Sequence, residues 1–181
     1  MSEADQASGA SAPKQFEIYR AAEYRDYGEH NIMEIADTTP AILDALGEFD
    51  REGGGAGQKV RMAYSRPGMS LTHVWFKSGY PLPLHSHTGD CLYYLLAGSV
   101  RVGTETLGPG DGFFVGSDVP YTYETGPDGA EVLEFRGTDA LNIRFIAKGK
   151  GAWDKTVGKL REKRADWEGE LPPSLKAAAK A

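Results

Sequence analysis

The sequence lacks several features that would define a class of protein. It has a single cysteine, Cys91, so it cannot form an intramolecular disulfide and implies no oxidising compartment. Its 20 basic residues against 26 acidic ones give a net charge of −6, which argues against a general nucleic-acid binder or an anionic membrane as partner. No apolar run approaches a membrane span, and the N-terminus MSEADQASGASAPKQ does not resemble a signal peptide. We therefore expect a cytoplasmic protein.

What the sequence does have is a series of short alternating stretches between residues 59 and 147. Gly, Pro, Asp and Ser separate them. The strand candidates are KVRMAYS, SLTHVWFKS, CLYYLLAGSVRVG, GFFVGS, YTYETG, AEVLEFRG and LNIRFIAK. Many short strands at close spacing are typical of a β-sandwich or barrel rather than a βαβ fold. The sequence predicts an all-β domain.

Helical patterns flank this domain. In TTPAILDALGEF, Thr39 can cap a helix and Pro40 suits its first turn. In WDKTVGKLREKRADWEGEL, an apolar stripe on a charged helix indicates docking on the barrel or on a partner subunit; the stripe consists of Trp153, Val157, Leu160 and Trp167. The predicted organisation is a disordered tail over 1–15, an N-terminal extension with a short helix over 16–58, the β-domain over 59–147, a C-terminal helix over 148–170 and a tail over 171–181.

The stretch GYPLPLHSHTGDCLYYLLAG contains the strongest chemical signal. His85 and His87 are two residues apart, so on an extended strand they project to the same side. By the same parity Cys91 and Tyr93 share that side. Two imidazoles on one face are a good start for a metal site. A bare H-x-H pair is a weak signal by itself, since chance pairs on solvated faces are common.

The surroundings of this pair resemble a known family. The spacing G(x5)HxH(x3)C(x6)G from Gly79 to Gly98 resembles the first motif of the cupin superfamily, in which a glutamate stands at the position of Cys91. A second segment, beginning at Gly110, resembles the second cupin motif in layout, with Tyr121 in the histidine position and Thr125 in the asparagine position. The resemblance covers roughly residues 59–147. It implies a single cupin jelly-roll β-barrel, here with an N-terminal helical extension and a C-terminal helix.

The resemblance implies that His85 and His87 bind a metal, while two of the usual four ligands are changed. Cys91 and Tyr121 could complete the site, since thiol and phenol both bind transition metals when deprotonated. Such a set suits iron best and zinc second. Cys91 could instead be a buried small hydrophobe, and Tyr121 a pocket wall. A barrel that has lost its metal, with the histidines left as polar pocket residues, is a further alternative.

Other residues are candidates for binding a substrate. We expect an aromatic-rich wall, which favours an apolar or aromatic small molecule over a bare sugar. His73 lies on the preceding strand and could supply a third imidazole if its face is interior. Glu134 and Arg136 alternate with apolar residues, a pattern that favours solvent exposure, although they could enter the barrel to hold a polar substrate. The predicted substrate-binding residues are Trp75, Tyr93, Phe113 and His73.

The functional hypothesis is a metal-dependent cupin enzyme acting on a small organic substrate, most specifically an iron-dependent dioxygenase. Tyr121 or Tyr123 would stabilise charge that develops on the substrate. One alternative is a metal-free or non-enzymatic cupin that binds a small molecule. Another is a zinc-dependent lyase or isomerase. Cupins often pair through their sheets, so we also expect a homodimer.

Overall fold

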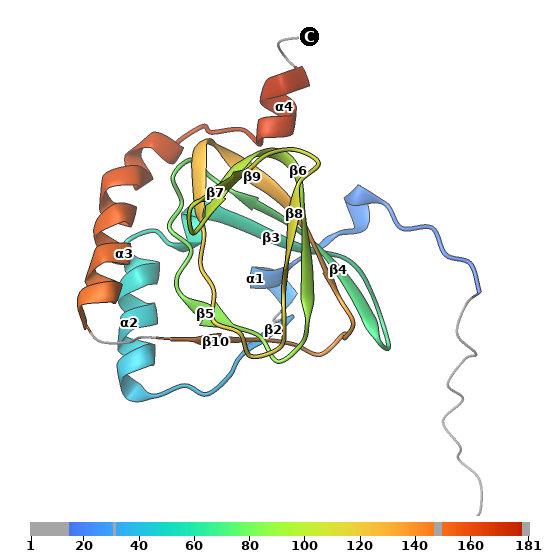
Figure 1. The fold of residues 1–181 in the computed structure, drawn as a ribbon, viewed down its shortest axis with the longest axis horizontal. Helices are drawn as coiled ribbons and strands as arrows, with labels where there is room; N and C mark the ends of the chain where they lie inside the picture. The colour runs from blue at the N-terminus through green and yellow to red at the C-terminus, as the bar shows by residue number, and fades with distance from the viewer. Residues whose placement is uncertain (1–14, 31, 147–149, 179–181) are drawn as a thin grey trace, which may run out of the picture.

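The computed structural model describes residues 15–30, 32–146 and 150–178. The tail predicted over 1–15 therefore lies, except for its last residue, outside the described residues. A large antiparallel sheet and a small mixed sheet form the body (Figure 1). Within the described residues, the two sheets are not hydrogen-bonded into a closed barrel. The all-β jelly-roll class predicted from the sequence is confirmed. None of the helices in these ranges is long and apolar enough to cross a membrane.

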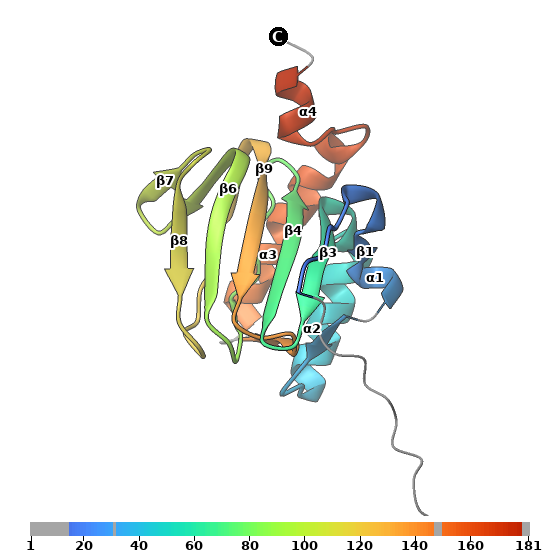
Figure 2. The same cartoon turned by 90° about the vertical axis from the view of Figure 1, so that its right-hand side faces the viewer.

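The larger sheet has the strand order β1-β3-β4-β9-β6-β7, with β8 also paired to β6. Figure 2 shows these strands side by side, with α2 and α3 on the far side. The strands of this sheet are β1 (Arg25–Asp26), β3 (Gln58–Arg66), β4 (Met69–Phe76), β6 (Cys91–Val102), β7 (Glu105–Leu107), β8 (Gly112–Val115) and β9 (Glu124–Arg136). The smaller sheet orders its strands β2-β10-β5, which are Met33–Ile35, Leu141–Phe145 and His85–Ser86.

Strand β6 is irregular along its length and pairs with three strands, β7, β8 and β9. Its register with β9 shifts between Leu95 and Ala97 and again between Gly98 and Val100. Gly98 has φ of 74°, and a Cβ there would lie 2.0 Å from the carbonyl oxygen of Gly129. Only glycine permits this close approach of the two strands.

The two helices that the sequence predicts both form. Helix α2 (Pro40–Arg51) is capped by Thr39, whose hydroxyl accepts a hydrogen bond from the backbone nitrogen of Ile42 at 3.3 Å. Helix α3 (Lys150–Lys163) and the turn η3 (Arg164–Trp167) bury the predicted apolar stripe. The remaining short helices are η1 (Ala21–Glu23), α1 (Tyr27–His30), η2 (Gly55–Gly57) and α4 (Pro173–Ala178).

The flanks differ from prediction in two ways. The N-terminal extension adds strands to both sheets, since β1 pairs with β3 and β2 pairs in parallel with β10. Residues 173–178 form a helix rather than a loose tail. The backbone nitrogen of Ser174 donates to the Glu131 carboxylate at 2.8 Å, and Nζ of Lys176 donates to the carbonyl oxygen of Asp128 at 3.2 Å. These polar contacts tie the segment to β9, and no pattern in the local sequence indicates them.

Candidate metal centre

The two motif histidines lie together, buried between the sheets. His85 and His87 are 2% and 7% exposed, and their ring centroids are 4.9 Å apart. Nδ1 of His85 donates to the carbonyl oxygen of Pro83 at 2.7 Å, and Nδ1 of His87 donates to the carbonyl oxygen of Asn142. Since a carbonyl can only accept, each Nδ1 carries the hydrogen of the neutral ring. Each Nε2 therefore presents a lone pair.

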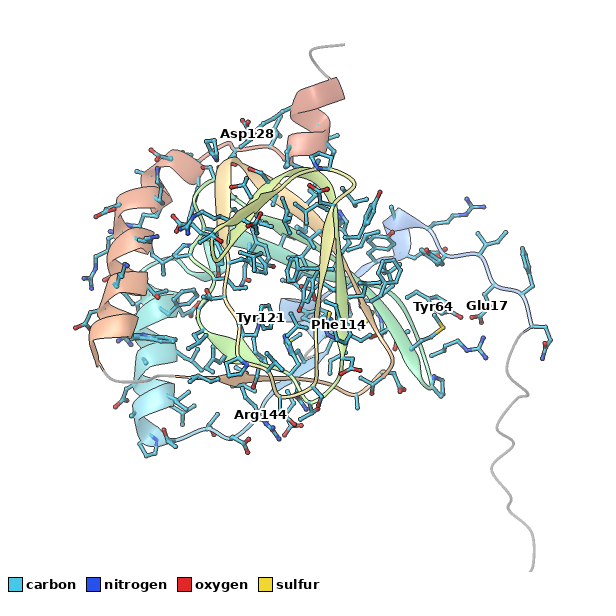
Figure 3. The ribbon with its side chains drawn as sticks, viewed as in Figure 1. Glu17, Tyr64, Phe114, Tyr121, Asp128 and Arg144 are labelled. Atoms are coloured by element: carbon cyan, nitrogen blue, oxygen red, sulfur yellow. The ribbon has the colours of Figure 1, made fainter. Side chains whose placement is uncertain are left out.

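Both lone pairs converge on one oxygen. The hydroxyl of Tyr121 lies 2.8 Å from Nε2 of His85 and 3.1 Å from Nε2 of His87. Figure 3 labels Tyr121 near the centre of the molecule. An antiparallel bridge between His85 and Tyr121 fixes the position of this side chain. Tyr121 has one hydroxyl proton, which serves one Nε2 at a time, so the other imidazole lacks a donor within this triangle.

Burial keeps these groups neutral. It lowers the pKa of His85 to about 4, with the neighbouring His87 as the next cause. It also lowers the pKa of His87 to about 4, with Arg136 contributing after burial. The pKa values of Tyr121 and Tyr123 are raised well above their ordinary value, by burial first and then by Glu134. At neutral pH, protonation is therefore an unfavourable way to satisfy the unpaired Nε2 lone pair. A metal cation that accepts the lone pair is a better one.

The other side chains predicted for this site lie behind the triangle formed by His85, His87 and Tyr121. The hydroxyl of Tyr93 hydrogen-bonds that of Tyr121, and Phe113 stacks on Tyr93 with centroids 4.4 Å apart. Cys91 is 1% exposed, and burial raises its pKa to about 12. Over the described ranges, no three His, Cys, Asp or Glu side chains gather as a metal site. The structure therefore does not bring Cys91 to the histidines as a ligand, and its placement matches the alternative of a buried small hydrophobe.

Two residues predicted to bind substrate lie on the wrong side of their strand. On β4, Val74 and Phe76 line the cavity described below, so His73 and Trp75 point to the outer face. His73 there contacts the carboxylate of Glu131 at 3.5 Å. The structure contradicts the expectation that His73 and Trp75 face the substrate. Period-two alternation places them on one face but does not indicate which face is interior.

A cavity of 310 Å³ opens beside the imidazole pair. Tyr121 and Tyr123 line it with the histidines, whereas Tyr93 and Phe113 support the wall from behind. Segments outside the predicted barrel close it, including Tyr27 of α1 and Phe49 of α2. The apolar part of the lining consists of Met33, Ile35, Phe49, Val60, Val74, Phe76, Leu82, Pro83, Ile143 and Phe145.

The sequence interpretation missed an ion pair inside this cavity. Glu134 and Arg136 are 7% and 5% exposed and both line the cavity, so the expectation that they face solvent is wrong. Nη2 of Arg136 donates to Oε2 of Glu134 at 2.7 Å. Their apolar neighbours face outward instead, with Phe135 41% exposed. An alternating strand whose apolar face is exposed cannot be oriented from its own residues.

Comparisons with known proteins find only distant structural similarity. No protein-family model and no curated protein sequence matches the chain. Among solved structures, the chain is similar to an RmlC-like cupin from Shewanella frigidimarina, at 24% identity over 46% of this chain and 78% of that one, with a TM-score of 0.42. It is also similar to the polyketide cyclase RemF from Streptomyces resistomycificus, at 20% identity over 59% of this chain and 82% of that one, with a TM-score of 0.49. KdgF from Halomonas sp. matches at 23% identity over 45% and 79%, with a TM-score of 0.40.

These similarities are weak and indicate no activity. The arrangement of the two motif segments is more decisive: the His85–His87 pair meets Tyr121 across an antiparallel bridge, beside a large antiparallel sheet and a small mixed one. The chain has the cupin fold. In this fold, the histidines of the first motif occupy the interior positions that the resemblance implies, and the second motif contributes a tyrosine in place of a histidine.

The residues present at this site fit a transition metal. Two neutral imidazoles with Nδ1 bonded to backbone carbonyls are oriented as metal-binding histidines usually are. Tyr121 offers a third donor, an oxygen that becomes anionic when a cation displaces its proton. His85, His87 and Tyr121 are the side chains that would hold the metal.

Proposed function

We propose that this cupin is a metal-dependent enzyme acting on a small organic substrate, and specifically an iron-dependent dioxygenase. The observation that carries the proposal is the convergence of two Nε2 lone pairs on Tyr121 with one proton between them. Two imidazoles and one anionic oxygen are close to the two-histidine, one-carboxylate set of non-haem iron oxygenases, which supports iron over zinc. Bound iron would supply open positions for the substrate and dioxygen.

The chain's own residues would prepare the substrate. The apolar lining of the cavity excludes water and holds the body of a molecule that is largely hydrocarbon or aromatic. Tyr123 lines the same cavity, and burial keeps its phenol protonated, so it can donate a hydrogen bond to a substrate oxygen on which charge develops. Tyr121 would then act as metal ligand, and Tyr93 would hold its oxygen in place.

Metal analysis of the purified protein tests this proposal. We expect about one iron per chain, lost in the His85→Ala/His87→Ala variant and retained in His73→Ala, a histidine on the opposite face of the sheet. Tyr121→Phe keeps the ring and removes the oxygen; it should weaken iron binding and abolish any visible absorption band of the ferric protein. Oxygen consumption with candidate substrates then tests the dioxygenase assignment. Zinc without oxygen consumption would favour a lyase or isomerase.

A metal-free binding protein is the second candidate. It is favoured by the contact of Tyr121 with both imidazoles, which partly satisfies them without a cation. Failure of the wild-type protein to bind any transition metal after reloading would exclude the enzyme proposed above and leave this candidate.

A homodimer remains part of the proposal, since the outer face of the large sheet exposes a row of apolar side chains.

A further inference from the structure

Arg136 is a buried cation with most of its hydrogen-bonding capacity unused. A guanidinium carries five N–H donors. Among the described residues, Arg136 makes two hydrogen bonds, from Nη2 to Glu134 at 2.7 Å and from Nη1 to the Thr72 hydroxyl at a long 3.4 Å. Its Nε is buried without a partner. The side chain belongs to the cavity wall.

Such an arrangement is unfavourable for the empty protein. Buried donors without acceptors destabilise a fold, and a buried ion pair is often no better than apolar residues of the same volume. Glu134 relieves only part of this cost, because the pair has one short contact rather than the two of a bidentate arrangement. The strand therefore holds a cation where an additional acceptor would be stabilising.

We propose that Arg136 anchors the carboxylate of a small organic acid whose apolar body fills the cavity. This inference rests on the function proposed above and names its substrate class. A carboxylate supplies several acceptor sites in the plane that a guanidinium fork matches. Arg136 lines the same cavity as His85 and His87, so an acid held by it would lie beside the imidazole pair.

The charges in the cavity agree with an anionic substrate. Glu134 and Arg136 cancel each other, and the neutral imidazoles add nothing. A divalent metal with a deprotonated Tyr121 would leave a net charge of +1 in a mostly apolar space. A monoanionic acid brings the net charge to zero, whereas an amide or an alcohol of the same shape does not.

Matched pairs of acids and amides test the anchor without knowledge of the reaction. The probes are benzoate, phenylacetate and 4-methylpentanoate, each with its amide, and the readouts are calorimetric affinity and the shift in melting temperature. We expect each acid to bind on the order of 10- to 100-fold more tightly than its amide, as expected for a charge-assisted hydrogen bond. The measurements use the protein as purified and again after chelation.

Three variants identify the group responsible. Glu134→Gln/Arg136→Met removes both charges, leaves the net charge unchanged and should abolish the preference for acids. Arg61→Met should retain the preference, because Arg61 also has a buried Nε without a partner but faces the outer side of β3, opposite His73. Glu134→Gln alone should increase the acid-induced shift, because the ligand no longer competes with a resident carboxylate. This last variant decides the matter if the double variant does not fold.

Two results would overturn the anchor: equal affinity for acids and amides in the wild type, or an acid preference that survives in Glu134→Gln/Arg136→Met. The second result means that acids bind a metal or another group. If only Glu134→Gln folds, an acid-induced shift no larger than that of the wild type overturns the anchor. Failure of the metal proposal is distinguishable, because it leaves a metal-free protein whose acid preference still depends on Arg136.

Discussion

Two neighbouring rows of side chains that cross the large sheet are opposite in character, and the more polar row is the interior one. One inward row crosses the strands as Thr72 on β4, Glu134 on β9 and Tyr93 on β6. The adjacent outward row is apolar across four strands, consisting of Leu71, Phe135, Leu92 and Phe114. In an ordinary soluble domain the apolar row would be buried and the charged row solvated.

This inversion agrees with the function proposed for the site. The inward row lines or backs the cavity in which the proposed substrate would bind, and the fold tolerates the desolvation of its charges and phenols. Three residues of the outward row are exposed, Leu92 at 51%, Phe114 at 63% and Phe135 at 41%, whereas Leu71 is buried at 8%. A contiguous exposed apolar patch often marks a surface that another molecule covers. We therefore propose that the interior binds a small ligand and that this outer row binds a protein partner.

Of the substitutions, breaking the buried ion pair should have the largest effect on stability. Arg136→Met leaves Glu134 as a buried carboxylate without its cation, and we expect a loss of about 3–5 kcal/mol in the free energy of unfolding. Urea denaturation at neutral pH measures it. Glu134→Gln/Arg136→Met should be far closer to the wild type, because no charge remains unpaired. A double variant as unstable as the single one would show that the charge of the pair is not what matters.

Acid should destabilise the protein through the imidazole pair. Both histidines have pKa values of about 4 in the folded protein, below the value of about 6.5 in an unfolded chain. The unfolded state therefore binds more protons between these values, and stability falls as the pH drops from about 6.5 toward 4. The loss approaches about 3 kcal/mol for each imidazole, at about 1.36 kcal/mol per pKa unit.

Denaturation of the chelated protein at several pH values between 7 and 4.5 measures this loss. His85→Gln/His87→Gln keeps polar side chains at both positions and removes the titration. The difference between wild type and variant isolates the imidazoles from other titrating groups. An identical pH dependence in both proteins would contradict neutral, desolvated histidines.

The sequence predicted the features of the site that follow from motif spacing. The H-x-H pair and the second motif indicated that His85, His87 and Tyr121 lie together, because motif spacing determines their position in the fold. The orientation of β4 and β9 could not be predicted. Their alternation divides residues between two faces, and Glu134 and Phe135 indicate the interior only after neighbouring strands are in place. The contribution of Tyr27 and Phe49 to the cavity likewise depends on contacts distant in sequence.

A change at Cys91, a buried residue at the start of β6, should have a moderate effect on stability. Because burial raises its pKa to about 12, the thiol should resist iodoacetamide at pH 8 in the native protein and react fully in denaturant. Cys91→Ala should cost about 1 kcal/mol in the free energy of unfolding, as for loss of a small buried group, and should leave the metal content unchanged. Loss of metal in this variant would restore Cys91 as a ligand.

Changes on the outer row should have the smallest effect on the stability of one chain and the largest on assembly. Leu92→Thr/Phe114→Thr keeps residues that favour strands, and both positions are exposed, so the free energy of unfolding should change by no more than about 0.5 kcal/mol. We propose a second copy of this chain as the partner of the row, and light scattering should show a dimer in the wild type and a monomer in the variant.

Leu43→Gln provides the matched control, since Leu43 is 55% exposed on α2, away from the row. It should leave the dimer intact. A monomeric wild type would exclude self-association through this face, while a dimer that survives the double variant would place the interface elsewhere. A dimer lost only when the outer row changes would show that the apolar row, exposed in a single chain, is covered in the assembly. The inward polar row, in contrast, is buried within each chain, where the ligand proposed above would offset its cost.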